Sequence, residues 1–139
     1  MNSPAIDRSA AHDPDIIDAA RAAIAGFFAA INASDQNAVK TKWLHFPHFR
    51  LHSGKLTVMN TPDELASPVL SRSGKAAEWA KTVWDFADPI DSGPDKVHFR
   101  VQFTWHRADG SAIGTYRSLY IVTLKDGRWG IQGRSTWAE

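Results

Sequence analysis

The chain has 139 residues and no cysteine, so it is long enough for one domain with a normal core, without disulfides, thiolate metal ligands or a cysteine nucleophile. Its formal net charge is only +1, with both signs interspersed, which argues against nucleic acid or an anionic membrane as the main partner. No apolar run approaches the roughly 20 residues that span a bilayer, and residues 1–12 lack the apolar stretch of a signal peptide, so we expect a cytoplasmic protein.

Residues 1–12 are small and polar, and we expect them to be a disordered lead-in to a single domain over residues 13–139. Asp13 and Pro14 are typical of a helix start, because Asp caps the first turn and proline lacks only a donor that would be unpaired there. Ser34 is placed to cap a short second helix, which Pro47 ends. The first helix should bury one apolar stripe at helical spacing, made by Ile16, Ile17, Ala20, Ile24, Phe27, Phe28 and Ile31.

A two-stranded hairpin and a third helix are predicted next. Residues 48–52 alternate between polar and apolar side chains, and Ser53 and Gly54 turn the chain back into a strand over residues 56–60. The run Thr61-Pro62-Asp63-Glu64 has the pattern of a capping box with proline at the first helical position. A helix is therefore expected to begin there, to be interrupted near residues 71–74 and to resume through residue 80.

Four strands complete the expected domain, the first of them over residues 84–89. In the second, Val97, Phe99, Val101, Phe103 and Trp105 alternate strictly with His98, Arg100, Gln102, Thr104 and His106. The apolar set should face the helices and the polar set the opposite side. Asp-Gly pairs at residues 109–110 and 126–127 are strong signals for hairpin turns. The strands that follow these turns are expected over residues 113–124 and 128–137.

Helices grouped on one side of such a sheet define an α+β domain. We predict a cone-shaped fold, in which a strongly curved antiparallel or mixed sheet is covered on one face by three helices. The helices would close one end and leave a conical cavity lined by Phe and Trp.

Three segments of the chain resemble the nuclear transport factor 2-like superfamily, and more narrowly its small bacterial SnoaL-like and ketosteroid isomerase-like members. They are FFAAINASD at residues 27–35, WLHFPHFRL at 43–51 and DGRWGIQGRSTW at 126–137, and they occur in the family's order. The resemblance covers about residues 13–137. It implies the same cone fold, a small-molecule pocket, chemistry without a cofactor, and a homodimer, but not one activity, since such proteins include isomerases, cyclases, dehydratases and ligand binders.

The resemblance also implies where steroid isomerase chemistry would lie. That enzyme group has an oxyanion-donating Tyr on the first helix at the position of Phe27, and a general-base Asp near His52 or Ser53. A third group, an Asp on the penultimate strand, falls at about Tyr120. Phe27 has no hydroxyl and no carboxylate matches the base, so this reaction would need His48 or His52 as base, whereas Tyr120 could still donate a hydrogen bond.

His45, His48 and His52 are the densest group of titratable side chains in the sequence. A histidine can act as a base near neutral pH, and His48 lies where the second helix leads to the expected pocket mouth. The alternative is that His45 lies at the helix end and the other two on the solvated strand face. A metal site is disfavoured, because no Asp or Glu lies nearby in sequence to complete a ligand set.

Arg134 could face either way on the last strand. If it faces inward, its planar guanidinium would bind a carboxylate, phosphate or enolate. If Trp129 and Ile131 face inward instead, Arg134 would point to solvent or to a partner subunit. Among the six tryptophans, Trp79 and Trp105 are expected to line the cavity, since Trp suits the walls of an apolar pocket.

The sequence favours a small-molecule pocket protein of the SnoaL-like class, whose activity, if any, is an isomerisation or dehydration by acid–base groups. The alternative is a non-catalytic ligand-binding or dimerisation module. The candidate catalytic residues are His48 and Tyr120, and the candidate ligand contacts are Phe27, Trp79, Trp105 and Arg134. A homodimer is expected through the outer face of the sheet, which would carry His98, Arg100, Gln102, Thr104, Arg117, Leu119 and Ile121.

Overall fold

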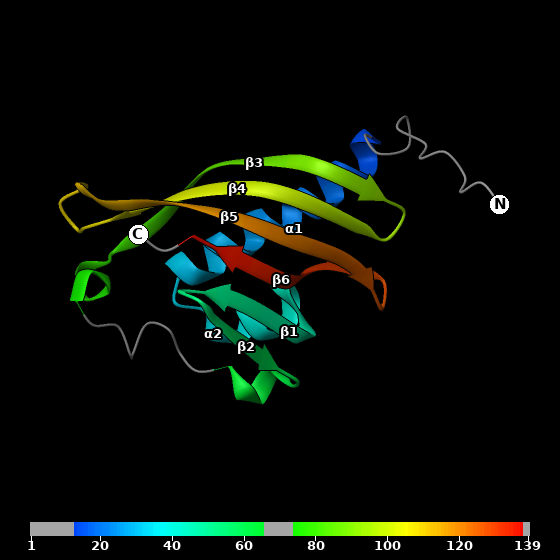
Figure 1. The fold of residues 1–139 in the computed structure, drawn as a ribbon, viewed down its shortest axis with the longest axis horizontal. Helices are drawn as coiled ribbons and strands as arrows, with labels where there is room; N and C mark the ends of the chain where they lie inside the picture. The colour runs from blue at the N-terminus through cyan, green and yellow to red at the C-terminus, as the bar shows by residue number, and fades with distance from the viewer. Residues whose placement is uncertain (1–12, 66–73, 138–139) are drawn as a thin grey trace.

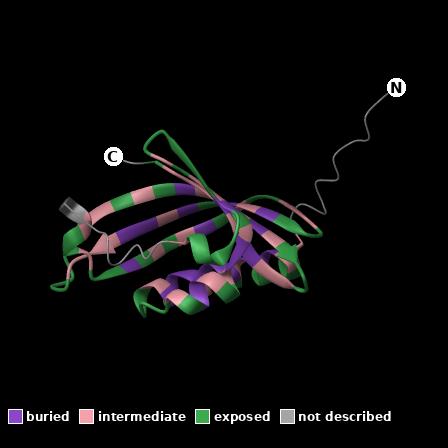
Figure 2. Cartoon of the chain, turned by 90° about the horizontal axis from the view of Figure 1, so that it is seen from below, coloured by how far each residue is buried: buried purple, intermediate pink, exposed green. Residues whose placement is uncertain are grey.

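The structure, a computed structural model, describes residues 13–65 and 74–137 (Figure 1). Within these ranges the chain forms one mixed sheet of six strands in the order β2-β1-β6-β5-β4-β3, with the helices packed on one face (Figures 1 and 2). The strands are β1 (Leu44–His52), β2 (Lys55–Met59), β3 (Lys81–Gly93), β4 (Lys96–His106), β5 (Ala112–Lys125) and β6 (Arg128–Thr136). The predicted α+β class and curved mixed sheet are confirmed. The expectation for residues 1–12 lies outside the described residues.

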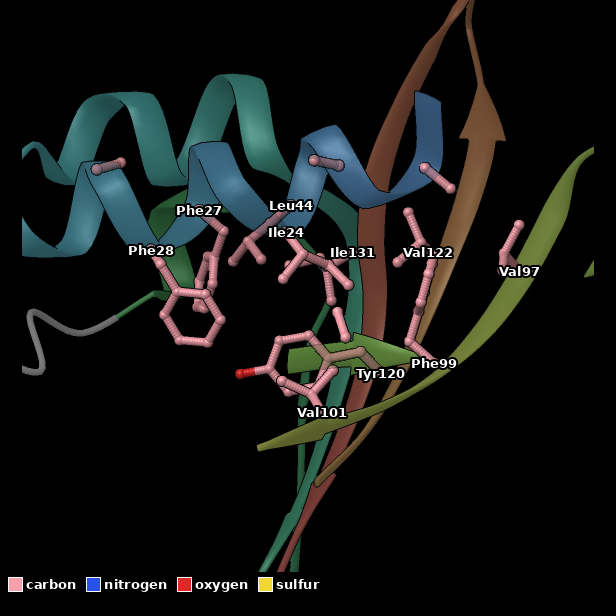
Figure 3. Packing of buried hydrophobic residues seen from close by; sticks show 14 of the residues in the cluster. Ile24, Phe27, Phe28, Leu44, Val97, Phe99, Val101, Tyr120, Val122 and Ile131 are labelled. Carbon is pink, nitrogen blue, oxygen red and sulfur yellow. The ribbon is translucent and has the colours of Figure 1, made fainter. Parts of the chain in front are cut away.

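Helix α1 (Pro14–Asn32) begins where the sequence predicts. The Asp13 carboxylate accepts a hydrogen bond from the Asp15 amide at 3.0 Å, and Pro14 occupies the first turn. None of the helices in the described ranges combines the length and the hydropathy that a membrane span requires. The apolar face of α1 packs on the sheet through Ile17, Ala20, Ala23, Ile24, Phe27, Phe28 and Ala30, as Figure 3 shows for Ile24, Phe27 and Phe28.

The second helix differs from the prediction in its cap and its end. Helix α2 (Gln36–Ala38) is capped by Asp35, whose carboxylate accepts from the Ala38 amide at 3.0 Å, and not by Ser34. It continues as a π-helical turn, η2 (Val39–Trp43), and β1 begins directly after it, so Pro47 lies within the strand. A Cβ on Gly26 would lie 2.4 Å from the Trp43 ring, so this glycine lets η2 approach α1 closely.

The predicted third helix is reduced to short 3₁₀ turns in the described residues. The Thr61 amide donates to the Glu64 carboxylate at 3.0 Å, as a capping box requires, but η3 (Pro62–Glu64) ends at Leu65, whose ψ is 106°. A second turn, η4 (Gly74–Glu78), precedes β3, and residues 66–73 lie outside the described part. A capping box satisfies only the donors of a first turn, whereas helix length depends on packing. Two α-helices rather than three therefore cover the sheet in the described ranges.

Strand β4 confirms the predicted alternation. Val97, Phe99 and Val101 are fully buried under α1, whereas Arg100 on the other face is exposed. Thr104 is an exception on the outer face, because it is buried and its hydroxyl donates to the Asp85 carboxylate of β3 at 2.8 Å. The core thus lies between α1 and the inner face of the sheet (Figures 2 and 3).

A β-bulge at Gln132 determines which face of the sheet the following side chains of β6 point to. Val122 of β5 pairs with Ile131, and the preceding Ile121 pairs with Gly133, so Gln132 is an extra residue. Its side-chain amide accepts from Thr123 at 3.0 Å and donates to the Pro47 carbonyl, which holds the bulge in place. Because one residue is inserted, the alternation shifts by one position, and the side chains of Ile131 and Arg134 leave the same face of the sheet.

Candidate functional site

Four of the six predicted site residues meet beneath α1. Arg134 Nε donates to His48 Nε2 at 3.2 Å, and the Arg134 guanidinium carbon lies 5.0 Å from the centre of the Phe27 ring. The Phe27 and Tyr120 ring centres are 6.2 Å apart, and Figure 3 shows the two rings between α1 and the sheet. Aromatic and cationic groups from α1, β1, β5 and β6 are thus brought together in one cluster.

The inward direction of Arg134 follows from the bulge. Ile131 is buried in the core, and simple alternation from it would turn Arg134 outward. The extra residue reverses that alternation, so Arg134 pairs with the buried Tyr120 and shares its face. The outward alternative is therefore wrong, although its premise that Ile131 faces inward is right.

His48 is held by hydrogen bonds on both ring nitrogens. It is fully buried, and its Nδ1 lies 3.0 Å from the Ile131 carbonyl oxygen. A carbonyl can only accept, so Nδ1 carries the proton and the Nε2 lone pair accepts from Arg134. The alternative that His48 lies on a solvated strand face is wrong.

The electrostatics of the cluster keep His48 neutral. Desolvation by burial, and then the Arg134 charge, lower the pKa of His48 to about 3, against the opposing effect of the Ile131 hydrogen bond. A base whose conjugate acid has so low a pKa is weak near neutral pH, and its lone pair is already engaged. His48 therefore positions Arg134, and its neutrality leaves the arginine charge uncompensated.

Arg134 and Tyr120 remain in their usual protonation states. Burial lowers the pKa of Arg134 to about 10, so that the side chain is still a cation at neutral pH. Burial raises the pKa of Tyr120, while the neighbouring Arg134 opposes that shift, so the phenol keeps its proton. The site thus offers a fixed positive charge beside a neutral hydroxyl.

Arg50 and His52 also belong to this face and were not predicted as a pair with Arg134. Arg50 pairs directly with Arg134 across the parallel β1 and β6, so both side chains leave the same face of the sheet. The Nδ1 atom of His52 is buried without a hydrogen-bond partner, and burial, then Arg50 and Arg134, lower the pKa of His52. The alternation of His48, Arg50 and His52 in the sequence is the signal that could have identified Arg50.

The two predicted tryptophans lie farther along the sheet. Trp105 packs on Tyr116, with ring centres 4.9 Å apart, and Trp79 Nε1 donates to the Thr82 hydroxyl at 2.8 Å. Thr82 pairs with Trp105, so both tryptophans lie at the same end of β3 and β4. The aromatic rings of Phe103 and Tyr116 stand between this end and Tyr120.

His45 has a structural environment in β1. It is buried, and its Nε2 lies 3.0 Å from the Arg128 carbonyl oxygen. Desolvation lowers the pKa of His45, although the Arg128 hydrogen bond opposes this shift. Within the described ranges, no three His, Asp or Glu side chains are grouped so that they could hold a metal ion.

Two hollows lie at the ends of the sheet. One of about 260 Å³ opens at the ends of β1 and β6, next to His52. It is lined by Leu51, His52, Ser53, Gly54, Ser135, Thr136 and Trp137. The other, of about 280 Å³, lies at the β3–β4 turn, away from the cluster, and is lined by Asp91, Ser92, Gly93, Asp95, Lys96 and His98.

Comparison with protein-family models and with curated proteins gives no match. Among solved structures, the fold is similar to a ketosteroid isomerase-like protein from Erwinia carotovora atroseptica, with 20% identity, a TM-score of 0.65 and coverage of 90% of this chain and 96% of that one. It is also similar to an NTF2-like protein from Cytophaga hutchinsonii, with 18% identity, a TM-score of 0.63 and coverage of 91% and 98%.

A third similar structure is an NTF2-like protein with a cystatin-like fold from Novosphingobium aromaticivorans, with 12% identity, a TM-score of 0.68 and coverage of 88% and 81%. These comparisons confirm, at the level of the fold, the resemblance to nuclear transport factor 2-like proteins. Because proteins with this fold differ in activity, the fold alone does not assign one.

Proposed function

We propose that the protein binds a small organic molecule on the inner face of its sheet, against Phe27, Tyr120 and Arg134. The observation that carries this proposal is the position of Arg134, a cation held under an aromatic ring by a neutral histidine. Neither of the ion pairs in the described part of the chain includes this arginine. A charged donor placed in this way is suited to an oxygen atom of a ligand.

Binding without proton transfer is the function that these groups support better than isomerisation. Abstraction of a proton near neutral pH requires a base with a pKa close to that pH. His48 has a pKa of about 3, and Phe27 and Tyr120 are not bases. We therefore favour the ligand-binding alternative over acid–base catalysis, and the similarity to a ketosteroid isomerase-like protein supports only the fold.

The proposal is tested by nuclear magnetic resonance titration with a set of small aromatic ketones, amides and acids. We expect amide shifts to cluster at Phe27, Tyr120 and Arg134. Tyr120→Phe, which keeps the ring and removes the hydroxyl, should weaken binding about 3- to 10-fold, as the loss of one hydrogen bond does. Tyr116→Phe is the matched control and should bind as the wild type does.

Two results would count against this function. Ligand-induced shifts confined to the outer face of the sheet would place the site elsewhere. Conversion of a β,γ-unsaturated ketone to its conjugated isomer well above the rate in buffer would show that a base is present and would favour catalysis.

A second proposal concerns the homodimer, which we place on the outer face of the sheet. Phe49 and Leu51 of β1 pair with Val58 and Leu56 of β2, and side by side they form an apolar surface that faces away from α1. Leu56 is 60% exposed, Val58 51% and Leu51 42%. A self-complementary contact through this surface would remove it from water.

The same surface continues across β6 to Leu119 and Ile121 of β5, which pair with Ser135 and Gly133. At the other edge, Gln102 and Thr104 already donate to Asp85 of their own chain, at 3.3 and 2.8 Å. The apolar centre of the proposed interface therefore lies nearer to β1 and β2 than the predicted residues alone suggest.

Light scattering tests this interface. The wild type should have about twice the chain mass of 15.4 kDa, and Leu56→Lys should lower it to the monomer mass. Ile90→Lys is the control, because Ile90 is equally exposed at 57% but lies on β3 at the opposite edge. A wild-type monomer at micromolar concentration contradicts the proposal.

A further inference from the structure

Arg50 and Arg134 form a pair of like charges on the inner face of the sheet. They are direct neighbours in the register of the parallel β1 and β6, and both are half-buried. In the described residues, neither takes part in an ion pair with a carboxylate. Like charges directly opposite each other destabilise a sheet, and a bound anion would remove that repulsion.

The neighbouring groups add one hydroxyl and no negative charge. Tyr120, which pairs with Arg134 on the other side, is a neutral phenol. His48 is neutral and occupies the Nε donor of Arg134, and the guanidinium also hydrogen-bonds with the Tyr120 side chain, which leaves its other terminal N–H groups for a ligand. Two terminal N–H groups of one guanidinium match the two oxygens of a carboxylate.

A hollow opens at the ends of β1 and β6, and its lining residues His52 and Thr136 lie two positions beyond Arg50 and Arg134. His52 follows Arg50 on the same face of β1, and it lines the hollow of about 260 Å³ at the strand ends. Among the side-chain nitrogen and oxygen atoms of the described residues, its Nδ1 is the one that is buried without a hydrogen-bond partner. A buried polar atom without a partner is unfavourable, so this nitrogen is a further contact for a polar ligand that enters from the hollow.

We propose that Arg50 and Arg134 together bind the carboxylate of an organic monoanion, whose apolar part lies against Phe27. This inference rests on the proposed small-molecule site and names the chemical class of its ligand. A monoanion fits better than a phosphate ester dianion, because the desolvation of an ion increases steeply with its charge and the surrounding rings are apolar. Arg50 is thereby a binding residue in addition to those that the sequence analysis predicts.

The test compares three probes of similar shape: benzoate, the neutral benzamide and phenyl phosphate. Calorimetric or resonance titration should show that benzoate binds at least 10-fold more tightly than benzamide, as expected for hydrogen bonds to a charged group. Raising the salt concentration should weaken benzoate binding and leave benzamide unchanged. These measurements use the wild-type protein and do not depend on the folding of a variant.

Variants then assign the effect to the pair. Arg50→Met keeps the apolar stem, and it should lower the affinity for benzoate about 10-fold or more without changing the affinity for benzamide. The benzoate affinity of Arg50→Lys should lie between those of Arg50→Met and the wild type. As a control, Lys81→Met removes an exposed charge from β3, at the far edge of the sheet. This variant should change the affinity for neither benzoate nor benzamide.

The outcomes separate this inference from the proposed function. Equal affinity for benzoate and benzamide, or undetectable binding of both at millimolar concentration, overturns the carboxylate site. In the first case a neutral small-molecule site remains. Tighter binding of phenyl phosphate overturns the choice of a monoanion. Benzoate binding that Arg50→Met leaves unchanged, while that variant keeps the wild-type fold, overturns the role of Arg50.

Discussion

The neutral state of His48 predicts a specific loss of stability in acid. Its pKa is about 3 in the folded protein, against an ordinary value of 6.5 in the unfolded chain. Between these two pH values the unfolded chain binds more protons, so lowering the pH favours unfolding. The contribution of neutral His48 to the free energy of unfolding is complete above pH 6.5, and it is lost as the pH falls toward 3. Over the full window this amounts to about 5 kcal/mol, and about 2 kcal/mol is already lost at about pH 5.

The assay is urea unfolding of the wild type and of His48→Gln at about pH 7.5 and about pH 5. Glutamine cannot titrate, and its amide oxygen can still accept from Arg134. We expect the variant to be less stable than the wild type at the higher pH, because the Ile131 carbonyl loses its donor. Between the two pH values, however, the wild type should lose about 2 kcal/mol more than the variant.

The comparison isolates His48, because His45 and His52, whose pKa values are also lowered, are present in both proteins. An equal loss of stability in the two proteins would show that the folded state accepts a proton on His48. The hydrogen bond from Arg134 to Nε2 would then be absent, and the argument for Arg134 as a fixed cation would fail with it.

Two further predictions concern the elements that hold the site. A Cβ on Gly133 would lie 2.1 Å from the Phe49 ring, so Gly133→Ala should destabilise the protein by about 1–3 kcal/mol in urea unfolding, and an unchanged midpoint would contradict the close packing of β1 on β6. Asp35→Ala should cost about 1 kcal/mol by removing the cap of α2, whereas Ser34→Ala should change stability little; equal effects would show that the cap is assigned to the wrong residue.

The sequence predicts the fold correctly where local sequence signals and tertiary structure agree. The alternation in residues 97–103 has no inserted residue, so each apolar side chain in it reaches the core. The capping box predicted at Thr61 is present, but a start signal contains no information on how far a helix continues. Ser34 and Asp35 are both good capping residues, and only the geometry of the loop distinguishes them.

The sequence predicts the site only in part, because the site depends on one β-bulge and on one pairing of strands that are distant in the chain. The inserted Gln132 reverses the alternation of β6, and sequence alternation alone does not reveal such an insertion. The pairing of β1 with β6 brings together residues that are far apart in the chain, as His48 and Arg134 are 86 positions apart. The sequence could therefore nominate His48 and Arg134 singly, but not Arg50 as the neighbour of Arg134.

The protonation states of the cluster separate two functions that the fold alone leaves open. Acid–base catalysis needs groups whose pKa values lie near the working pH, and enzymes move them there by burial and by neighbouring charges. Here burial acts in the opposite direction: it lowers the pKa of His48 to about 3 and raises that of Tyr120, while Arg134 titrates only at about 10. None of these three groups changes its charge at neutral pH. They combine a constant positive charge with the neutral Tyr120 hydroxyl, and this combination supports the proposed anion site better than a proton-transfer site.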